Sequence, residues 1–254
     1  QYDWEETTYQ LLAKNFGFKV NSEPMLRLSQ ALPLKVLRRH SSSPIQLEAL
    51  LFGQAGLLEN PEDDYSQQLQ KEYQFLARKY NLPDAALHAS HWKFLRMRPA
   101  NFPTVRIAQM ATLLGRFSNL FSLFVNHPPK DLLEMLQIRQ SDYWQQHYHL
   151  AKEAKGPVPG LGTSSIENII INTVAPLLVC YAREKSEERY TEKALEFLEH
   201  TRPENNKLLR PWQDLGVPIQ SAYDSQALTG LYQNYCQRKQ CLQCSIGLDL
   251  MKRG

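Results

Sequence analysis

Apolar residues recur along the 254-residue chain at spacings of three or four positions, which is the period of an α-helix. In the first such stretch, Leu12 and Phe16 follow Asp3, a residue type that favours helix N-caps, and Glu6 stands three positions later. Gly17 predicts the end of this helix. Further helices are predicted from residue 44 and at 62–80, 104–114, 130–136, 165–182, 190–198 and 225–236. Because alternation typical of strands hardly occurs, we predict an all-α, multi-helix globular array of roughly ten or more helices.

Proline and glycine interrupt the helical pattern most densely between Ala154 and Gly162, in the sequence AKGPVPGLG. These residue types break helical periodicity and mark turns. We therefore predict an N-terminal helical region at 1–155 and a C-terminal helical region at 156–254. Both lengths lie within the usual range of domains.

Composition and charge narrow the class of protein only slightly. Apolar residues make up 43% of the chain, and 29 Lys and Arg against 26 Asp and Glu give a net charge of +3. This mild excess permits a nucleic-acid partner without requiring one. The longest apolar stretch, 166–182, contains Glu167 and Pro176, so we expect a buried helix and no membrane span. The absence of a signal peptide and of a cysteine framework predicts a cytoplasmic protein.

Three of the four cysteines lie close together near the end of the chain, where Cys236, Cys241 and Cys244 form a C-x4-C-x2-C pattern. Thiolates bind zinc or iron–sulfur clusters, and a C-x2-C pair brings two sulfurs to one ion. A closed site needs a fourth ligand, for which Cys180 and His200 are candidates. The pattern therefore predicts a zinc or iron–sulfur site, with reduced cysteines that only pack and bind no cofactor as the alternative.

The loop that contains Gly160 and Gly162 is a candidate phosphate-binding element. Glycines let the backbone turn sharply and present its amides, and the predicted helix that follows would add the positive end of its dipole. The alternative is an ordinary turn between helices, with Ser164 or Ser165 as the N-cap.

A second candidate for phosphate contacts is the stretch 92–106, in which cations alternate with aromatic residues. Arg96, Arg98 and Arg106 would reach phosphates while the aromatic rings stack on bases. We expect Arg96 and Arg98 to share one side of an extended segment. In the alternative, the aromatic residues anchor the core and the arginines pair with carboxylates at 59–64.

The sequence contains no Gly-x-Ser-x-Gly, Walker or His-Glu-x-x-His motif, so no catalytic residue is assigned. We therefore predict a non-catalytic helical module that binds DNA through backbone phosphates. The alternative is a protein-interaction or scaffolding domain with neither metal nor nucleic acid. An enzyme whose active site lies outside this chain is a third possibility.

Five stretches together resemble a bacterial family of unknown function, DUF2851. They are LAKNFGFKVN at 12–21, EALLFGQAGLL at 48–58, WKFLRMRPANFPTVRIAQMA at 92–111, NIIINTVAPLL at 168–178 and YCQRKQCLQCSIG at 235–247. The resemblance implies that the chain is the helical C-terminal part of a longer protein. The N-terminal region of that protein would then be a partner of this one. The family implies no reaction.

Residues 158–247 also resemble helix-hairpin-helix DNA glycosylases. VPGLGTSSIENIIINT at 158–173 is similar to their hairpin and the helix after it, and SQALTGLYQNYCQRKQCLQCSIG at 225–247 to the helix leading into their iron–sulfur loop. Ser164 stands where those enzymes place a catalytic lysine, and their fourth cysteine is missing. The resemblance therefore implies a related DNA-binding scaffold without base excision.

Overall fold

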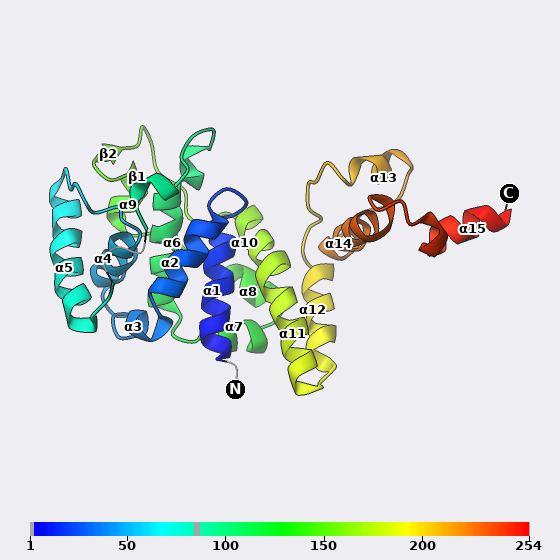
Figure 1. Ribbon diagram of the computed structural model, residues 1–254, viewed down its shortest axis with the longest axis horizontal. Coiled ribbons are helices and arrows are strands. Elements are labelled where there is room, and N and C mark those ends of the chain that lie inside the picture. Colours follow the sequence, from blue (N-terminus) through cyan, green and yellow to red (C-terminus); the bar gives the residue numbers. More distant parts are fainter. Residues whose placement is uncertain (1–2, 84–86, 254) are drawn as a thin grey trace. The chain divides into compact units, whose positions relative to one another are not determined.

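The computed structural model describes residues 3–83 and 87–253 and divides into two compact units, Gln1–Leu177 and Leu178–Gly254. Helices dominate both units, as the ribbon in Figure 1 shows, so the predicted all-α fold is confirmed. In the described ranges the regular strands are β1 (His147–His149) and β2 (Lys152–Glu153), which pair antiparallel. The boundary predicted between residues 155 and 156 falls inside the first unit, and the predicted domain division stays a prediction.

The hydrophobic pattern predicts the starts of six helices of the first unit to within two residues, and it does not predict four others. Short 3-10 turns (Ala89–His91 and Pro99–Asn101) and a π-helical turn (Ile170–Val174) complete the unit. The helices are α1 (Trp4–Phe16), α2 (Ser22–Ala31), α3 (Leu34–Arg38), α4 (Pro44–Gln54), α5 (Asp64–Tyr80), α6 (Pro103–Arg116), α7 (Leu120–Asn126), α8 (Pro129–Met135), α9 (Asp142–Gln146), α10 (Thr163–Ile169) and the start of α11 (Ala175–Lys185).

Helices α1 and α4 form the core of the first unit. In α1, Tyr9, Leu12 and Phe16 are fully buried, and the helix packs against α2, α6, α7 and α10. Helix α4 packs against both α5 and α6, so apolar residues on all its sides are buried. This explains why apolar residues occur on every side of α4, although the helix also contains Gln46, Glu48 and Gln54.

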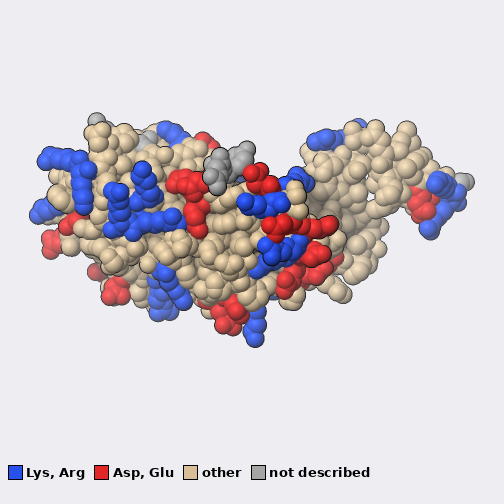
Figure 2. Space-filling view, turned by 90° about the horizontal axis from the view of Figure 1, so that it is seen from below, with Lys and Arg blue, Asp and Glu red and all other residues tan. Residues whose placement is uncertain are grey.

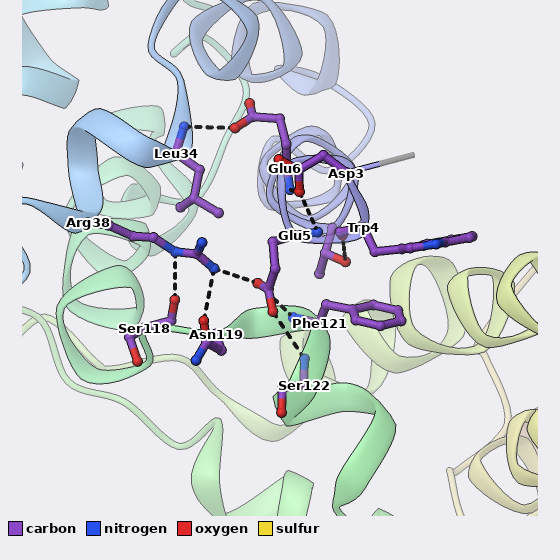
Figure 3. A network of polar contacts seen from close by, with 11 residues as sticks. Asp3, Trp4, Glu5, Glu6, Leu34, Arg38, Ser118, Asn119, Phe121 and Ser122 are labelled. Atoms are coloured by element: carbon purple, nitrogen blue, oxygen red, sulfur yellow. Dashed lines mark hydrogen bonds and ion pairs between the residues drawn. The ribbon is translucent and has the colours of Figure 1, made fainter. Parts of the chain in front are cut away.

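Two neighbouring glutamates of α1 cap other helices (Figure 3). Glu6 accepts a hydrogen bond of 2.9 Å from the first amide of α3. Glu5 accepts hydrogen bonds from the amides of Phe121 (3.1 Å) and Ser122 (3.3 Å), in the first turn of α7. Glu5 also forms an ion pair of 2.9 Å with Arg38. Since helix N-termini carry unsatisfied amides and a partial positive charge, these carboxylates tie α1, α3 and α7 together.

The second unit contains the rest of α11 and shorter helices. It comprises α12 (Arg189–Glu199), α13 (Arg210–Asp214), α14 (Ala222–Leu231), a π-helical turn (Tyr232–Cys236), a 3-10 turn (Cys241–Gln243) and α15 (Ser245–Arg253). Helix α12 packs on α14, whereas α15 has no buried residue.

One helical stretch within the described ranges, Thr163–Lys185, is long and apolar enough by length and composition to cross a membrane. Within the protein, 56% of the 18-residue apolar window of this stretch is buried. The core helices of globular proteins pass the same test.

Candidate functional site

Arg106, in the first turn of α6, is buried with only 6% of its surface exposed. Its guanidinium donates hydrogen bonds to Asn101 Oδ1 (2.6 Å), Gln109 Oε1 (2.9 Å) and Ser165 Oγ (3.2 Å), and it lies 4.4 Å from the centre of the Phe18 ring. Burial lowers the pKa of Arg106 to about 10. These contacts hold Arg106 against Ser165 at the start of α10 and leave it little exposed surface for a phosphate.

The two glycines of the loop before α10, Gly160 and Gly162, have different surroundings. A Cβ on Gly160 would come within 2.4 Å of the Ile138 carbonyl oxygen, which also accepts a hydrogen bond of 2.9 Å from the Leu161 amide. Gly160 is therefore required by close backbone packing. Gly162, the N-cap residue of α10, is exposed, and a Cβ there would meet nothing within 4 Å. Phosphate binding by this loop stays a prediction.

Arg96 and Arg98 are exposed, and neither forms an ion pair with any residue of 3–83 or 87–253. The expected extended segment is wrong, because Arg96 has a φ of +60° and the chain turns there. The aromatic residues anchor this loop, since buried Trp92 donates a hydrogen bond of 2.8 Å to the Ala55 carbonyl. The loop therefore has features of both interpretations. Its aromatic residues anchor it to the core, and Arg96 and Arg98 are exposed cations that have no ion pair among the described residues.

All four cysteines lie in the second unit. Cys244 is buried, whereas Cys180, Cys236 and Cys241 are exposed. The described residues contain no group of three or more His, Cys, Asp or Glu side chains arranged to hold a metal. A Cβ on Gly247 would lie 2.3 Å from the Cys241 carbonyl oxygen, so close packing shapes this corner. The predicted zinc or iron–sulfur site, with Cys180 as the fourth ligand, stays a prediction.

The outer face of α5 carries a basic surface that no motif in the sequence indicates. Its side chains line a shallow groove and comprise Lys71, Gln74, Phe75, Arg78 and Lys79. Phe75 is 61% exposed, and the three cations form no ion pair within the described part of the chain. Spacings of four and eight positions from Lys71 to Phe75 and Lys79 could have revealed this shared face. We call these five residues the α5 basic face.

Basic side chains also gather next to the α5 basic face. Lys79 and Arg39 approach the same ring, that of Tyr80, with their charged groups 5.3 and 5.7 Å from its centre. Figure 2 shows Lys and Arg side chains grouped over the end of the first unit where Figure 1 places α3, α4 and α5. The positive charge of the first unit is therefore distributed unevenly.

A buried carboxylate, Glu48, lies in the middle of α4 with 1% of its surface exposed. The Tyr65 hydroxyl and the Trp144 indole nitrogen (2.9 Å) both donate to the same oxygen, Glu48 Oε2. The Trp144 ring stacks on Phe52 with 4.7 Å between centres. Burial raises the pKa of Glu48, and hydrogen bonding by Tyr65, Ser141 and Trp144 opposes that rise only in part.

Glu48 lines a cavity of about 280 Å³ that is bordered by α4, α6 and residues 139–141. Its other polar lining residues include Thr112, Arg116, Arg139 and Ser141. The Ser141 hydroxyl is buried, lowers the pKa of Glu48 and has no hydrogen-bond partner of good geometry among the described residues. Arg116 and Arg139 are exposed and form no ion pair with any residue that the structure describes. We call this space the Glu48 cavity.

No sequence motif points to the Glu48 cavity, because its lining comes from three segments far apart in the chain. The available signal is a single acidic residue inside the apolar run LEALLF at 47–52. A charged residue is rarely buried unless it is paired or used, so this position stands out.

The fold and these sites define a globular all-α protein with a basic face and a polar cavity. The model of a family described as "Protein of unknown function (DUF2851)" matches residues 1–207, and the chain belongs to this family. The expected place of the chain in the C-terminal part of the family does not fit this match, and residues 235–247 lie beyond it. Searches among curated proteins and among solved structures found no match, so they lend the helix-hairpin-helix resemblance no support.

Proposed function

We propose that the first unit binds nucleic acid, DNA in particular, through backbone phosphates and without catalysis. The observation that carries this proposal is the α5 basic face, where three cations without an ion pair among the described residues line one groove with an exposed aromatic ring. Lys and Arg that neutralise phosphates release counterions, and aromatic rings stack on unpaired bases. Arg96 and Arg98 are two further exposed cations that form no ion pair within residues 3–83 and 87–253.

The spacing of the cations on α5 suits a phosphate backbone. Lys71 and Lys79 are eight residues apart, which is about 12 Å along a helix axis. One strand of duplex DNA advances about 3.4 Å per phosphate, so this separation corresponds to between three and four phosphates. Phe75 lies midway between the two lysines, where a base of a single strand would stack.

A salt titration of DNA binding tests the proposal directly. We expect the plot of log K against log salt for duplex DNA to become shallower by roughly 0.9 for each phosphate that the triple variant Lys71→Gln, Arg78→Gln, Lys79→Gln no longer neutralises. The charge-matched control removes three exposed cations of other elements, Lys14→Gln, Lys19→Gln and Arg27→Gln. The double variant Arg96→Gln, Arg98→Gln shows whether the second pair contributes. Absence of binding at low salt, or equal slopes for the triple variant and its control, would refute the proposal.

Phe75→Ala separates base stacking from charge. We expect this variant to weaken binding of single-stranded DNA by about 1–3 kcal/mol and to leave duplex binding nearly unchanged. Equal losses for the two forms of DNA would show that Phe75 does not stack on bases.

The rival function, a protein-interaction module, is favoured by one observation in the second unit. Apolar residues around α15 are exposed, namely Leu242, Ile246, Leu248, Leu250 and Met251. Exposed apolar groups of this size often mark protein contacts. This function predicts no salt-dependent DNA binding, and it predicts that Leu250→Glu reduces any self-association measured by light scattering. An unchanged mass distribution together with DNA binding would count against it.

A further inference from the structure

We propose that the Glu48 cavity binds a small hydroxylated oxyanion, meaning a compound with a phosphate or carboxylate group and a neighbouring hydroxyl. This inference goes beyond nucleic-acid binding and does not depend on it. The cavity residues are separate from the α5 basic face.

The mouth of the Glu48 cavity supplies the positive charge that an oxyanion requires. Arg116 and Arg139 both line it, come from different segments and have no ion-pair partner among the described residues. Guanidinium groups match the geometry of phosphate and carboxylate oxygens and bind them with paired hydrogen bonds. Two arginines at one cavity therefore favour an anion over a neutral ligand.

The start of α4 adds to this preference. Ser41, Ser42 and Pro44, which lead into the 11-residue helix, also line the cavity. The N-cap residue Ser43 makes no side-chain hydrogen bond to the first-turn amides. A helix N-terminus carries a partial positive charge and favours an anion close to it.

The inner end of the cavity is built to meet a hydroxyl group. Tyr65 and Trp144 both donate to Glu48 Oε2, and we infer that Oε1 is the oxygen that accepts from a ligand hydroxyl. The buried Ser141 hydroxyl next to it also lacks a full hydrogen bond. Burying polar atoms without partners is costly, and a ligand hydroxyl can satisfy both because it donates and accepts.

The size of the cavity limits the ligand to small molecules. A volume of about 280 Å³ holds roughly nine groups of the size of a water molecule, at about 30 Å³ each. This lies just below the usual range of about 300–1,000 Å³ for ligand pockets. A three-carbon compound with one phosphate or carboxylate fits this volume, whereas a nucleotide does not.

Calorimetric titration of the full chain tests the inference with glycerol 3-phosphate, glycerate and inorganic phosphate as probes. We expect glycerol 3-phosphate or glycerate to bind, and the double variant Arg116→Gln, Arg139→Gln to weaken that binding roughly 10- to 100-fold. The matched control Lys19→Gln, Arg27→Gln removes two exposed cations away from the cavity and should bind as the unmodified protein does. No binding of any probe, or equal losses in both double variants, would overturn the inference.

The role of Glu48 is tested by the preference between probes. We expect the unmodified protein to bind glycerol 3-phosphate about tenfold more tightly than inorganic phosphate, and Glu48→Gln to lose most of this preference. The exposed arginine variants keep the test valid even where Glu48→Gln folds poorly. Equal affinity for the two probes in the unmodified protein would overturn the part of the inference that concerns the hydroxyl. DNA binding should be unchanged in all the cavity variants, so the two proposals fail separately.

Discussion

Two charged side chains, Glu48 and Arg106, are buried in the first unit, and the structure pairs neither with an opposite charge among the residues it describes. Arg106 gives its hydrogen bonds to three neutral side chains and covers the Phe18 ring. Glu48 accepts two hydrogen bonds at one carboxylate oxygen and is one of the residues that line a cavity. The guanidinium of Arg106 is enclosed by the fold, whereas Glu48 borders a cavity.

The different surroundings of Glu48 and Arg106 show that burial of a charge does not by itself identify a functional site. Removing Arg106 would leave several partners without hydrogen bonds, so its role is to hold α6, α10 and the loop before α6 together. Tyr65 and Trp144 donate to Glu48 Oε2 alone, and Glu48 lines a cavity together with Arg116 and Arg139. Arg106 also has one buried donor without a partner, its Nε, so the two residues differ in that Glu48 lines a cavity rather than in the number of unused hydrogen-bonding positions.

The largest expected effect on stability is that of Arg106→Met. This variant leaves Asn101, Gln109 and Ser165 without their common donor, and we expect the free energy of unfolding to fall by about 3 kcal/mol. Urea unfolding followed by tryptophan fluorescence measures the change. The control Arg96→Met alters an exposed side chain and should stay within about 0.5 kcal/mol. A loss of less than about 1 kcal/mol for Arg106→Met would show that the fold depends on Arg106 no more than on Glu48.

Glu5, which forms an ion pair with Arg38, is expected to have an intermediate effect on the free energy of unfolding. Glu5→Ala removes the cap of α7 and the ion pair with Arg38, and we expect a loss of about 1–2 kcal/mol. The estimate is modest because the Glu5 side chain is 21% exposed and solvent screens the pair. Thermal unfolding of this variant is compared with Glu134→Ala, an exposed residue near the end of α8. Equal melting temperatures would show that the network in Figure 3 contributes little.

We expect Glu48→Gln to cost less than about 1 kcal/mol at neutral pH. Tyr65 and Trp144 share one acceptor oxygen, and the amide oxygen of glutamine can accept both hydrogen bonds. The variant also removes the cost of keeping a charge in a buried position. Hydrogen exchange of α4 measures the local stability, with Arg106→Met as the comparison. A loss as large as that of Arg106→Met would mean that the carboxylate is structural.

The smallest expected effect is that of Arg139→Gln, which should change the free energy of unfolding by no more than about 0.5 kcal/mol. Arg139 is exposed and makes no ion pair within residues 3–83 and 87–253, so the fold does not depend on it. Urea unfolding in parallel with Glu48→Gln checks this. A clear loss of stability would show that Arg139 has a structural contact in addition to its place at the cavity.

Local signals in the sequence predict most helices, because caps and apolar spacing act over a few residues. Asp3 and Gly17 flank α1, and the proline at 44 begins α4, as the pattern indicates. Helices α2, α3, α7 and α9 and the short strand pair carry weaker patterns, which do not predict them. The sequence places Glu6 at the N-terminus of its own helix, but its carboxylate reaches the start of α3 instead, which depends on tertiary packing.

The candidate sites are less predictable than the helices for the same reason. The sequence singles out Arg106 and Gly160 as candidate phosphate-binding residues. Only the packing around them shows that Arg106 is buried and that Gly160 lies against the backbone at residue 138. The Glu48 cavity requires the convergence of residues 41–48, 111–116 and 139–141. No spacing within one segment reveals such a convergence.

The most direct test of the contrast between the two charges is the difference in unfolding free energy between the unmodified protein and Glu48→Gln, measured against pH. The folded protein raises the pKa of Glu48 above its ordinary value of 4.5, so it binds the proton more tightly than the unfolded chain does. The resulting stabilisation is present below pH 4.5 and is lost as the pH rises through the raised pKa. The account predicts that the unmodified protein loses stability relative to Glu48→Gln over this range, whereas a constant difference, or a relative gain with rising pH, would contradict it.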